Sequence, residues 1–476
     1  MKRKEFFQKS ITFAGAAAIL PSVFGKSFLD AQTETIPTTE TPLYNNPNGH
    51  TPHLEVQISS PKFGVASLED PASSEWESLR NQLFPINSTL TYLNNGTMGI
   101  TPYPVLHALN KAFTHTAENG AYPHADGSLE AAIADVLGCD SDEIAITKNV
   151  SEGVNLACWG IPLKKGDEVL ITKHEHVGGC AAWLHRAKVD GIVLKVVELG
   201  PNAEETLKNF QAAATNKTKV IAIPHIPCTI GQVLPVQKIC QWAKSASIFT
   251  AIDGAHPAGM LQINLHEIGC DYYAGCLHKW MLAPIGLGFF YCTKNMLEKT
   301  KIHHVAAYSV DKFDMSTNPP TFGELAQKTG RFSYGSFCGP LYEAGKTAIQ
   351  LYKNIGPDNI QNRVKYLQGT VDTQLREINK LAIDPGLIQI LTPTEYASRG
   401  AQTAFRIAPA TQPSLSQKFC DYARKKGIVL RYVGENNIDC VRVSTHYYNL
   451  ESEITTFSTA LRGFLKEENL LKSTGE

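Results

Sequence analysis

The sequence predicts an α/β fold in which helices cover a mainly parallel β-sheet, followed by a smaller α+β domain at the C-terminus. Strand-like and helix-like segments alternate from Trp76 onward. Residues 167–176, 220–226 and 248–255 contain β-branched or apolar strand-like runs, and residues 236–247 carry apolar side chains at helical spacing. Such alternation is typical of a parallel sheet whose crossover connections are helices.

The pattern changes beyond about Gly335. The chain is first helix-like and then ends in short strand-like runs such as GIVLRYV and DCVRVST. We therefore predict a large domain over residues 76–335 and a small domain over residues 336–476. In open parallel sheets ligands bind beyond the carboxyl ends of the strands, so the site is expected there.

The composition is ordinary for a globular protein, with 43% hydrophobic and 19% charged residues. The net charge is -1, so neither nucleic acid nor an anionic membrane surface is indicated as a partner. The 11 cysteines are scattered without a CxxC motif, which fits neither a disulfide scaffold nor a structural zinc site. We expect a small-molecule substrate and no metal.

The N-terminus resembles an export signal. MKRKEFFQKS is basic, and the apolar stretch ITFAGAAAILPSVFG that follows is too short to span a bilayer comfortably. RKEFFQK is similar to the twin-arginine signal, with Lys4 in place of the second arginine. We predict a signal over residues 1–31, export to the periplasm and a Thr/Pro/Asn/Ser-rich linker over residues 32–75; an uncleaved anchor is the alternative, and a non-functional signal would leave the protein cytoplasmic.

Three polar clusters follow predicted strands. Ser151 begins a predicted helix, whose N-terminus offers free N–H groups and a positive dipole end to a phosphate. Asp253 ends the buried run AIDGA, and Lys279 follows the strand-like DYYAGC. Taken singly, the three residues read as a helix cap, a turn aspartate and a solvated lysine. Together they match the needs of pyridoxal phosphate: an anion site, an acid for the pyridine nitrogen and a Schiff-base lysine.

These motifs carry a resemblance to the class V aminotransferase family of pyridoxal phosphate enzymes, over residues 92–457. DGAHPAG followed by HKW is specific as a pair, and CLHKWMLAPIGLGFFY and YLNNGTMGITP look most like the isopenicillin N epimerase branch. The resemblance implies the fold of the pyridoxal phosphate-dependent transferases (fold type I) and a homodimer with active sites at its interface.

The resemblance also assigns the residues around the cofactor ring. It implies that Lys279 forms the Schiff base and that Asp253 keeps the pyridine nitrogen protonated. His256 falls where family members hydrogen-bond the phenolic oxygen. His176, in KHEHVGG, falls where relatives stack a histidine on the ring.

The cofactor phosphate has its own expected partners. The backbone N–H groups of Ser151 and Glu152 and the side chain of His278 match phosphate contacts in the family. Ser336, in SYGSFCGP, matches a residue that reaches the phosphate from the neighbouring subunit.

Substrate contacts are expected from residues near the two ends of the region that resembles the family. Arg442, in VRVSTHYY, matches the arginine that binds the α-carboxylate, and Arg431 is a second candidate for that role. Asn95, in YLNNGTMG, is a further candidate for substrate binding. Two positions depart from the family pattern. Cys276 stands where many relatives carry Ser or Asn, and Cys228 stands where many carry Asn.

The residues leave the reaction open among three choices. An epimerase needs a second acid–base group besides Lys279, for which His176 and Tyr92 are candidates. A carbon–sulfur lyase needs only Lys279, and an aminotransferase is equally compatible. A cysteine desulfurase is disfavoured because its only candidate thiol, Cys440, lies in a strand-like run. A non-catalytic binding protein is disfavoured because Asp253, Lys279 and their companions are intact.

Overall fold

A computed structural model describes residues 68–120, 126–307, 309–310, 312–409 and 413–472. All of them belong to one unit, residues 58–476. The predicted export signal and most of the predicted linker lie outside the described residues. Among the described residues, helix α3 spans Glu75–Leu83, close to the predicted start of the large domain at residue 76.

A seven-stranded sheet is the centre of the large domain, and its mainly parallel character confirms the predicted fold class. Six strands run in one direction, and β8 alone is antiparallel to its two neighbours. The order is β2 (Ile144–Thr147), β8 (Gly288–Cys292), β7 (Tyr272–Cys276), β6 (Phe249–Gly254), β5 (Thr218–Pro224), β3 (Glu168–Thr172) and β4 (Val193–Val197).

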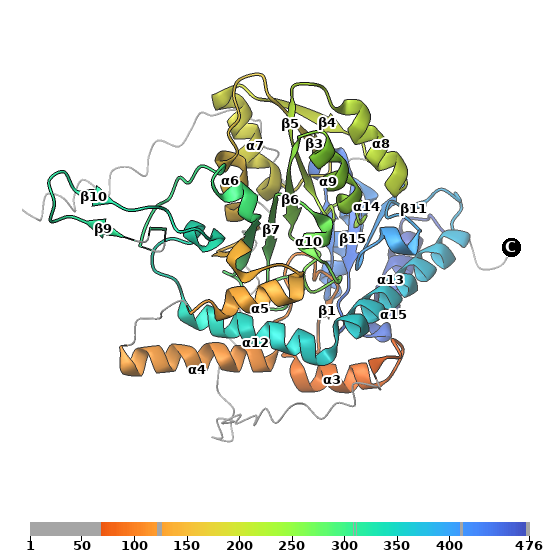
Figure 1. Cartoon of the computed structure of the whole chain (residues 1–476). Coiled ribbons are helices and arrows are strands. Elements are labelled where there is room, and N and C mark those ends of the chain that lie inside the picture. Colours follow the sequence, from red (N-terminus) through yellow and green to blue (C-terminus); the bar gives the residue numbers. More distant parts are fainter. Residues whose placement is uncertain (1–67, 121–125, 308, 311, 410–412, 473–476) are drawn as a thin grey trace, which may run out of the picture. The chain divides into compact units, whose positions relative to one another are not determined.

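Helices cover both faces of this sheet, which explains why its central strands are mainly apolar. On β5, Val220 and Ala222 belong to one hydrophobic cluster, and Ile221 and Ile223 belong to another. Figure 1 shows α6 and α7 on one side of the strands and α8, α9 and α10 on the other. The helices are α6 (Val150–Gly160), α7 (Val177–Asp190), α8 (Ala203–Ala213), α9 (Val236–Ser245) and α10 (Leu265–Ile268). Alternating side chains of a strand point to opposite faces, so a doubly covered strand is apolar at most positions on both faces.

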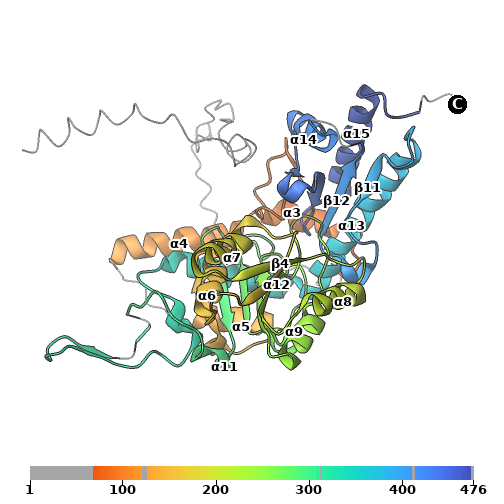
Figure 2. The ribbon, with the colours of Figure 1, turned by 90° about the horizontal axis from the view of Figure 1, so that it is seen from above.

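The C-terminal part is built on a separate antiparallel sheet, seen beside the large sheet in Figure 2. Its strands are β11 (Ile388–Ile390), β12 (Gln402–Ile407), β15 (Cys440–Ser444) and β14 (Arg431–Val433), in that order. Phe405, Phe419 and Phe457 form a cluster of aromatic rings between this sheet and its helices. The helices are α13 (Pro357–Lys380), α14 (Leu415–Lys425) and α15 (Glu451–Glu467).

Two segments tie these parts together. The strand β1 (Thr91–Tyr92) pairs in parallel with β13 (Ile428–Val429), although 335 residues or more separate them in sequence. The helix α12 (Gly339–Ile355) packs against α4 (Tyr103–Asn119) and α5 (Ser128–Leu137). Because Ala344 and Ala348 of α12 join the core of the large sheet, this helix shares the large domain's core although it follows the predicted boundary at residue 335.

A two-stranded segment extends away from the large sheet in Figure 1. Its strands β9 (Phe313–Asp314) and β10 (Thr321–Phe322) pair with each other, and the short α11 (Lys294–Leu297) precedes them. Phe313, Met315 and Phe322 are 68%, 72% and 61% exposed, respectively. Exposed apolar side chains gathered in one segment are typical of a surface that contacts another molecule.

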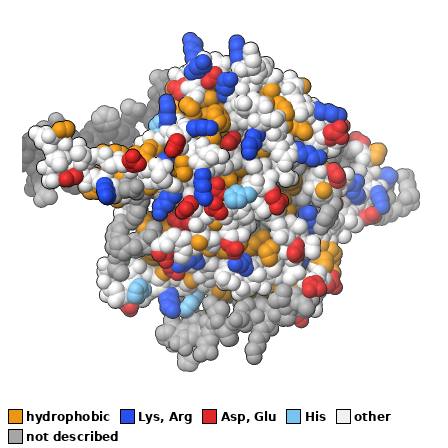
Figure 3. All heavy atoms as spheres, viewed as in Figure 1, with side chains coloured by type: hydrophobic (Ala, Val, Ile, Leu, Met, Phe, Trp, Pro, Cys, Tyr) orange, Lys and Arg blue, Asp and Glu red, His pale blue; other side chains and the backbone are white. Residues whose placement is uncertain are grey.

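The face drawn in Figure 3 carries acidic and basic side chains interspersed with one another. This mixture agrees with the net charge of -1. Within the described ranges, no helix combines the length and the apolar character that a membrane crossing requires.

Candidate active site

The predicted cofactor residues meet at the carboxyl ends of the parallel strands. Asp253 is the penultimate residue of β6 and pairs in register with Ala274 of β7. Lys279 comes three residues after the end of β7, and His176 caps α7 directly after β3. The parallel register of β3, β5, β6 and β7 therefore brings side chains from distant parts of the sequence to one edge of the sheet.

Asp253 is held as a partly exposed carboxylate at this edge. Its Oδ1 accepts a hydrogen bond from Ala255 N at 2.9 Å. Burial raises the pKa of Asp253, while the Ala255 bond and the Lys279 ammonium act in the opposite direction. A cationic partner would therefore stabilise the ionised form, as the protonated nitrogen of a pyridine ring does.

His256 presents a hydrogen-bond donor to the site. Its Nδ1 accepts from Trp280 Nε1 at 3.1 Å and lies 2.6 Å from Gln402 Nε2. Because indole N–H can only donate, Nδ1 is the unprotonated nitrogen and Nε2 carries the proton. That Nε2 is buried without a partner in the described protein. Burial lowers the pKa of His256, so the ring stays neutral and keeps one N–H for an acceptor such as a phenolic oxygen.

His176 is fixed by the helix that it caps. Its Nδ1 accepts from Gly178 N at 3.1 Å. Packing around the ring, followed by the nearby cations Lys279 and Arg431, lowers the pKa of His176 to about 4, although the residue is partly open to solvent. In the neutral ring the proton therefore lies on Nε2, and the ring can stack on a cofactor but does not offer Nε2 as a base.

The phosphate end of the predicted site lies where α6 and α7 begin. A Cβ on Gly178 would lie 2.5 Å from Ser151 Oγ, so the two helix N-termini approach closely. Positive helix-dipole ends attract phosphate. The N–H of Glu152, however, already donates to the cap residue Asn149 Oδ1 at 3.0 Å. The Ser151 contact stays a prediction, and the Glu152 contact requires that Asn149 yield its bond.

His278 and Ser336 differ in how the fold places them. The Nδ1 of His278 is buried without a protein partner, and burial together with Lys279 lowers the pKa of the ring to about 4. Ser336 lies in an exposed segment ahead of α12. Its contact with a phosphate of the neighbouring subunit stays a prediction.

Arg442 is fully buried on β15 and faces the segment that follows β1. Its Nη2 donates to Asn94 Oδ1 at 3.0 Å and to Thr97 Oγ1 at 2.9 Å, and its Nη1 donates to Cys228 O at 3.0 Å. Burial, and then the nearby Arg431, lower the pKa of Arg442 to about 9. Its Nε has no partner in the described protein. Such a guanidinium is well placed to bind a carboxylate.

Arg431 has an anionic partner of its own. Its Nη2 is bonded to Glu435 Oε1, and the Cys228 side chain lies within hydrogen-bonding reach of the guanidinium. The pair Arg431–Glu435 therefore leaves Arg442 as the stronger candidate for the substrate carboxylate.

Asn95 contacts the backbone of Lys279. The side chain is fully buried, with Nδ2 donating to Lys279 O at 3.3 Å and Oδ1 accepting from Tyr448 OH at 2.8 Å. The backbone of Gly99 also packs against Lys279, since a Cβ on Gly99 would lie 2.2 Å from Lys279 O. The role of Asn95 in substrate binding stays a prediction. The side chains that contact Arg442 are instead those of Asn94 and Thr97, which the sequence analysis did not identify.

The two cysteines that depart from the family pattern are buried. Cys276 Sγ donates to Ala255 O at 3.4 Å, and burial raises the pKa of the thiol to about 11. Cys228 is 6% exposed and contributes its carbonyl to Arg442. Cys276 therefore fits the interpretation of a small, neutral, buried side chain.

These groups fit pyridoxal phosphate. The buried polar atoms without a protein partner include three from residues of this site, namely His256 Nε2, His278 Nδ1 and Arg442 Nε. Burying polar groups without partners is costly, so their presence at one edge of the sheet indicates a polar ligand. Donors suit the phenolic oxygen, the phosphate and a substrate carboxylate, and Asp253 suits the pyridine nitrogen.

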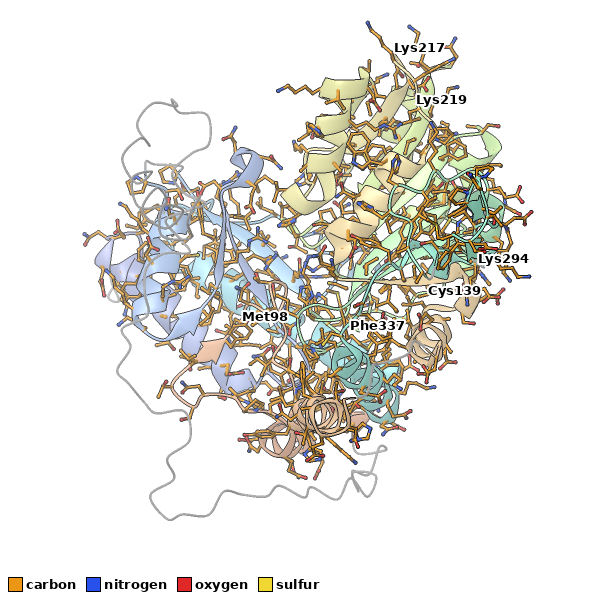
Figure 4. The ribbon with its side chains drawn as sticks, turned by 90° about the vertical axis from the view of Figure 1, so that its left-hand side faces the viewer. Met98, Cys139, Lys217, Lys219, Lys294 and Phe337 are labelled. Carbon is orange, nitrogen blue, oxygen red and sulfur yellow. The ribbon has the colours of Figure 1, made fainter. Side chains whose placement is uncertain are left out.

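A second group of titratable residues lies elsewhere. One ligand atom each of Asp140, Glu143 and His266 lies within 4.8 Å of the others. These side chains are already paired, with His266 Nε2 2.6 Å from Glu143 Oε2 and Lys294 Nζ 2.6 Å from Asp140 Oδ2. Figure 4 shows Lys294 beside Cys139, far from Met98 in the segment that follows β1. The pairing explains the cluster without a metal.

Comparison with known proteins identifies the class. The aminotransferase class-V family matches residues 91–457. The isopenicillin N epimerase of Amycolatopsis lactamdurans is 26% identical over 407 residues, which cover 83% of this chain and 100% of the relative. The probable cysteine desulfurase of Methanothermobacter thermautotrophicus is 26% identical over 395 residues, which cover 79% of this chain and 95% of the relative.

A solved structure shows the same relationship. The cystine C-S lyase C-DES, in complex with its reaction product cysteine persulfide, has a TM-score of 0.70 and 26% identity, covering 80% of this chain and 99% of that chain. The chain belongs to the aminotransferase class-V family and is an enzyme that uses pyridoxal phosphate. The predicted family, fold type and cofactor are confirmed.

Proposed function

We propose that this enzyme moves the proton at Cα of an amino acid or a small peptide, as an epimerase of the isopenicillin N epimerase type. The observation that carries the proposal is the connection between β14 and β15. Residues 434–439 contain no cysteine, and Cys440, which follows, is fully buried with Sγ bonded to Thr229 O. A desulfurase needs a nucleophilic cysteine on a mobile loop at this place, so the arrangement favours chemistry that needs no such thiol.

The protein groups divide the work at Cα. When bound, pyridoxal phosphate supplies an electron sink that weakens the bonds at Cα. The amine of Lys279 takes the proton on its side. The carboxylate of Asp253 would hold the proton on the pyridine nitrogen of the bound cofactor, and His256 Nε2–H would donate to its phenolic oxygen. Arg442 binds the substrate carboxylate and thereby orients the Cα bond that breaks.

Epimerisation also needs a proton donor on the opposite side of Cα. The hydrogen bond from Gly178 N to His176 Nδ1 leaves His176 without a free basic nitrogen at Nε2. Tyr92 is therefore the better candidate. Burial raises the pKa of Tyr92, with Arg442 acting in the opposite direction, so the phenol stays protonated near neutral pH and can give a proton to Cα. Its hydroxyl donates to Met98 O at 2.7 Å.

A carbon–sulfur lyase is the second candidate. The similarity to the cystine C-S lyase C-DES favours it, at 26% identity over nearly all of that chain. Such a lyase needs Lys279 but no second proton donor. An aminotransferase remains compatible with the same residues.

One experiment separates the three reactions. Purified holoenzyme is incubated with single amino acids and small peptides in deuterium oxide, and Cα deuterium, keto acid and released sulfur are measured together. Deuterium in both stereoisomers without the other products supports the epimerase. Sulfur release supports the lyase, and keto acid formation supports the aminotransferase. The variant Tyr92→Phe should slow epimerisation at least tenfold; a normal rate in that variant would remove Tyr92 from the mechanism.

The cofactor assignment to Lys279 has its own test. Borohydride reduction of the yellow holoenzyme, followed by peptide mapping, should place the pyridoxyl group on Lys279. A label on another lysine would refute the assignment. We also propose a homodimer, which the exposed Phe313, Met315 and Phe322 support as a contact surface. Export through a twin-arginine-like signal is likewise our proposal, and it rests on the sequence of residues 1–31.

A further inference from the structure

A buried carboxyl group that the proposed reaction does not use lies behind Asp253. Glu175 immediately precedes the ring-stacking candidate His176 and is 7% exposed. Its Oε1 accepts two hydrogen bonds from Thr172 at the end of β3, from the backbone N at 3.1 Å and from Oγ1 at 2.9 Å. These two bonds fix the orientation of the carboxyl group.

The second oxygen of Glu175 faces the same small space as Asp253. A Cβ on Gly179 would lie 2.6 Å from Asp253 Oδ2 and 3.8 Å from Glu175 Oε2. Glu175, Gly179 and Asp253 all line one cavity, together with Trp183. The absence of a side chain at Gly179 in the first turn of α7 therefore leaves a gap through which the two carboxyl groups face each other.

Two carboxyl groups that face one enclosed space do not ionise together at low cost. Burial, and then the charge of Asp253, raise the pKa of Glu175 to about 8, against the effect of the Thr172 bonds. Asp253 has a cation to favour its charged form: the ammonium of Lys279 in the protein without cofactor, and the protonated pyridine nitrogen that would face it in the holoenzyme. Three further titratable groups interact with the pair: Cys180 on α7, and Tyr273 and Cys276 on β7. Burial raises the pKa of each of them, so all three stay neutral.

The position of the proton follows from the hydrogen bonds. Oε1 of Glu175 already accepts from both donors of Thr172, so the acidic proton of the neutral group belongs on Oε2. Oε2 is the oxygen that faces the gap at Gly179. The neutral acid thus points its O–H toward the side of the site where Asp253 Oδ2 lies.

We propose that Glu175 is a positioning residue for Asp253, acting as a neutral carboxylic acid that directs its O–H at the Asp253 carboxylate and so keeps one negative charge at the pyridine nitrogen of the cofactor. The inference rests on the proposed role of Asp253 in the cofactor site. When Glu175 ionises, the donor is lost and a second negative charge appears beside the first. The electrostatic environment of the ring nitrogen then changes, and the pH at the midpoint of this change equals the pKa of Glu175.

The test follows the ring nitrogen itself. Holoenzyme is loaded with pyridoxal phosphate carrying 15N in the ring, and the 15N chemical shift is recorded by nuclear magnetic resonance from pH 6 to pH 10. The parent should show a step near pH 8. Glu175→Gln keeps an acceptor for Thr172 and a neutral donor at the other position but cannot ionise, so it should keep the 15N shift of the parent at pH 6 and lose the step.

A matched pair of variants at Thr172 gives a second reading that does not remove Glu175. The Thr172 hydroxyl bond lowers the pKa of Glu175. Thr172→Val removes that bond and should move the step to higher pH, whereas Thr172→Ser keeps it and should leave the step in place. A structural role alone would not move the midpoint in this selective way.

The outcomes are separable. A step at the same pH in Glu175→Gln, or no step in the parent, overturns the role of Glu175. Equal midpoints in the valine and serine variants overturn it as well, even if Glu175→Gln does not fold. Borohydride labelling of a lysine other than Lys279 overturns the cofactor assignment instead, so failure of the inference is distinguishable from failure of the proposed function.

Discussion

Replacing the titratable carboxyl group of Glu175 should change how the stability of the protein depends on pH. The folded chain holds the pKa of Glu175 at about 8, against 4.5 for an ordinary glutamate, because the carboxyl group is buried beside Asp253. Between these two values the folded state keeps the proton and the unfolded state releases it. Stability therefore falls as pH rises through this range, and the contribution of the proton is fully present only below pH 4.5.

The magnitude follows from the linkage relation. A group that is protonated when folded and ionised when unfolded changes the free energy of unfolding by about 1.4 kcal/mol for each pH unit. Between pH 5 and pH 7 the parent should therefore lose about 3 kcal/mol relative to Glu175→Gln, which carries no titratable group at this position.

The assay is urea unfolding of holoenzyme at pH 5, 6 and 7, comparing parent and variant at each pH so that other titrating groups cancel. Glu204→Gln serves as the control, because Glu204 is an exposed carboxylate on α8 whose pKa is lowered by Lys208. It is ionised in both states over this range, so its difference from the parent should not vary with pH. A flat difference for Glu175→Gln too would show that Glu175 is charged in the folded protein, and the reasoning from burial would be refuted.

Three further outcomes are expected. Asp253→Asn keeps the shape of the side chain but loses its charge, so Cα deuterium exchange at saturating cofactor should fall on the order of a hundredfold or more, with only a modest loss of cofactor affinity; near-normal exchange would reduce Asp253 to a turn residue. Gly99→Ala places a methyl group 2.2 Å from Lys279 O and 2.4 Å from a Leu282 methyl carbon, so it should cost about 1–3 kcal/mol in urea unfolding and lower the cofactor absorbance. Gly369→Ala in α13, where nothing lies within 4 Å, is its control and should be neutral or stabilising. Sedimentation should give a mass near twice the 52.1 kDa of one chain, and a single-chain mass at high concentration would contradict the dimer.

Much of the fold and the cofactor chemistry could be read from the sequence because the signals are local. The alternation of apolar runs with helical spacing predicts the parallel sheet, and each of Ser151, Asp253 and Lys279 follows a strand that the pattern identifies. Parallel strands end at the same edge, so residues that follow them meet without any knowledge of the tertiary contacts. The motif pair DGAHPAG and HKW then carried the family and the cofactor.

The tertiary structure alone decided the roles that depend on contacts between distant segments. Asn95 and Asn94 are adjacent in a loop, yet the first supports the Lys279 backbone and the second bonds Arg442. Both contacts depend on where this segment lies, which is fixed by the pairing of β1 with β13 and by a bridge between Asn94 and Ser444. The sequence does not signal this pairing, because two-residue strands are too short to show a period.

The protonation states were also beyond the sequence. His256 carries its proton on Nε2 because Trp280 donates to Nδ1, and Glu175 keeps its proton because Gly179 lets it face Asp253 while burial removes water. A side chain's charge depends on the groups packed around it, and these come from β3, β6 and α7. The sequence determined which chemical groups this enzyme brings to the edge of its sheet; the packing of those elements decided which of the groups are charged, which donate and which accept.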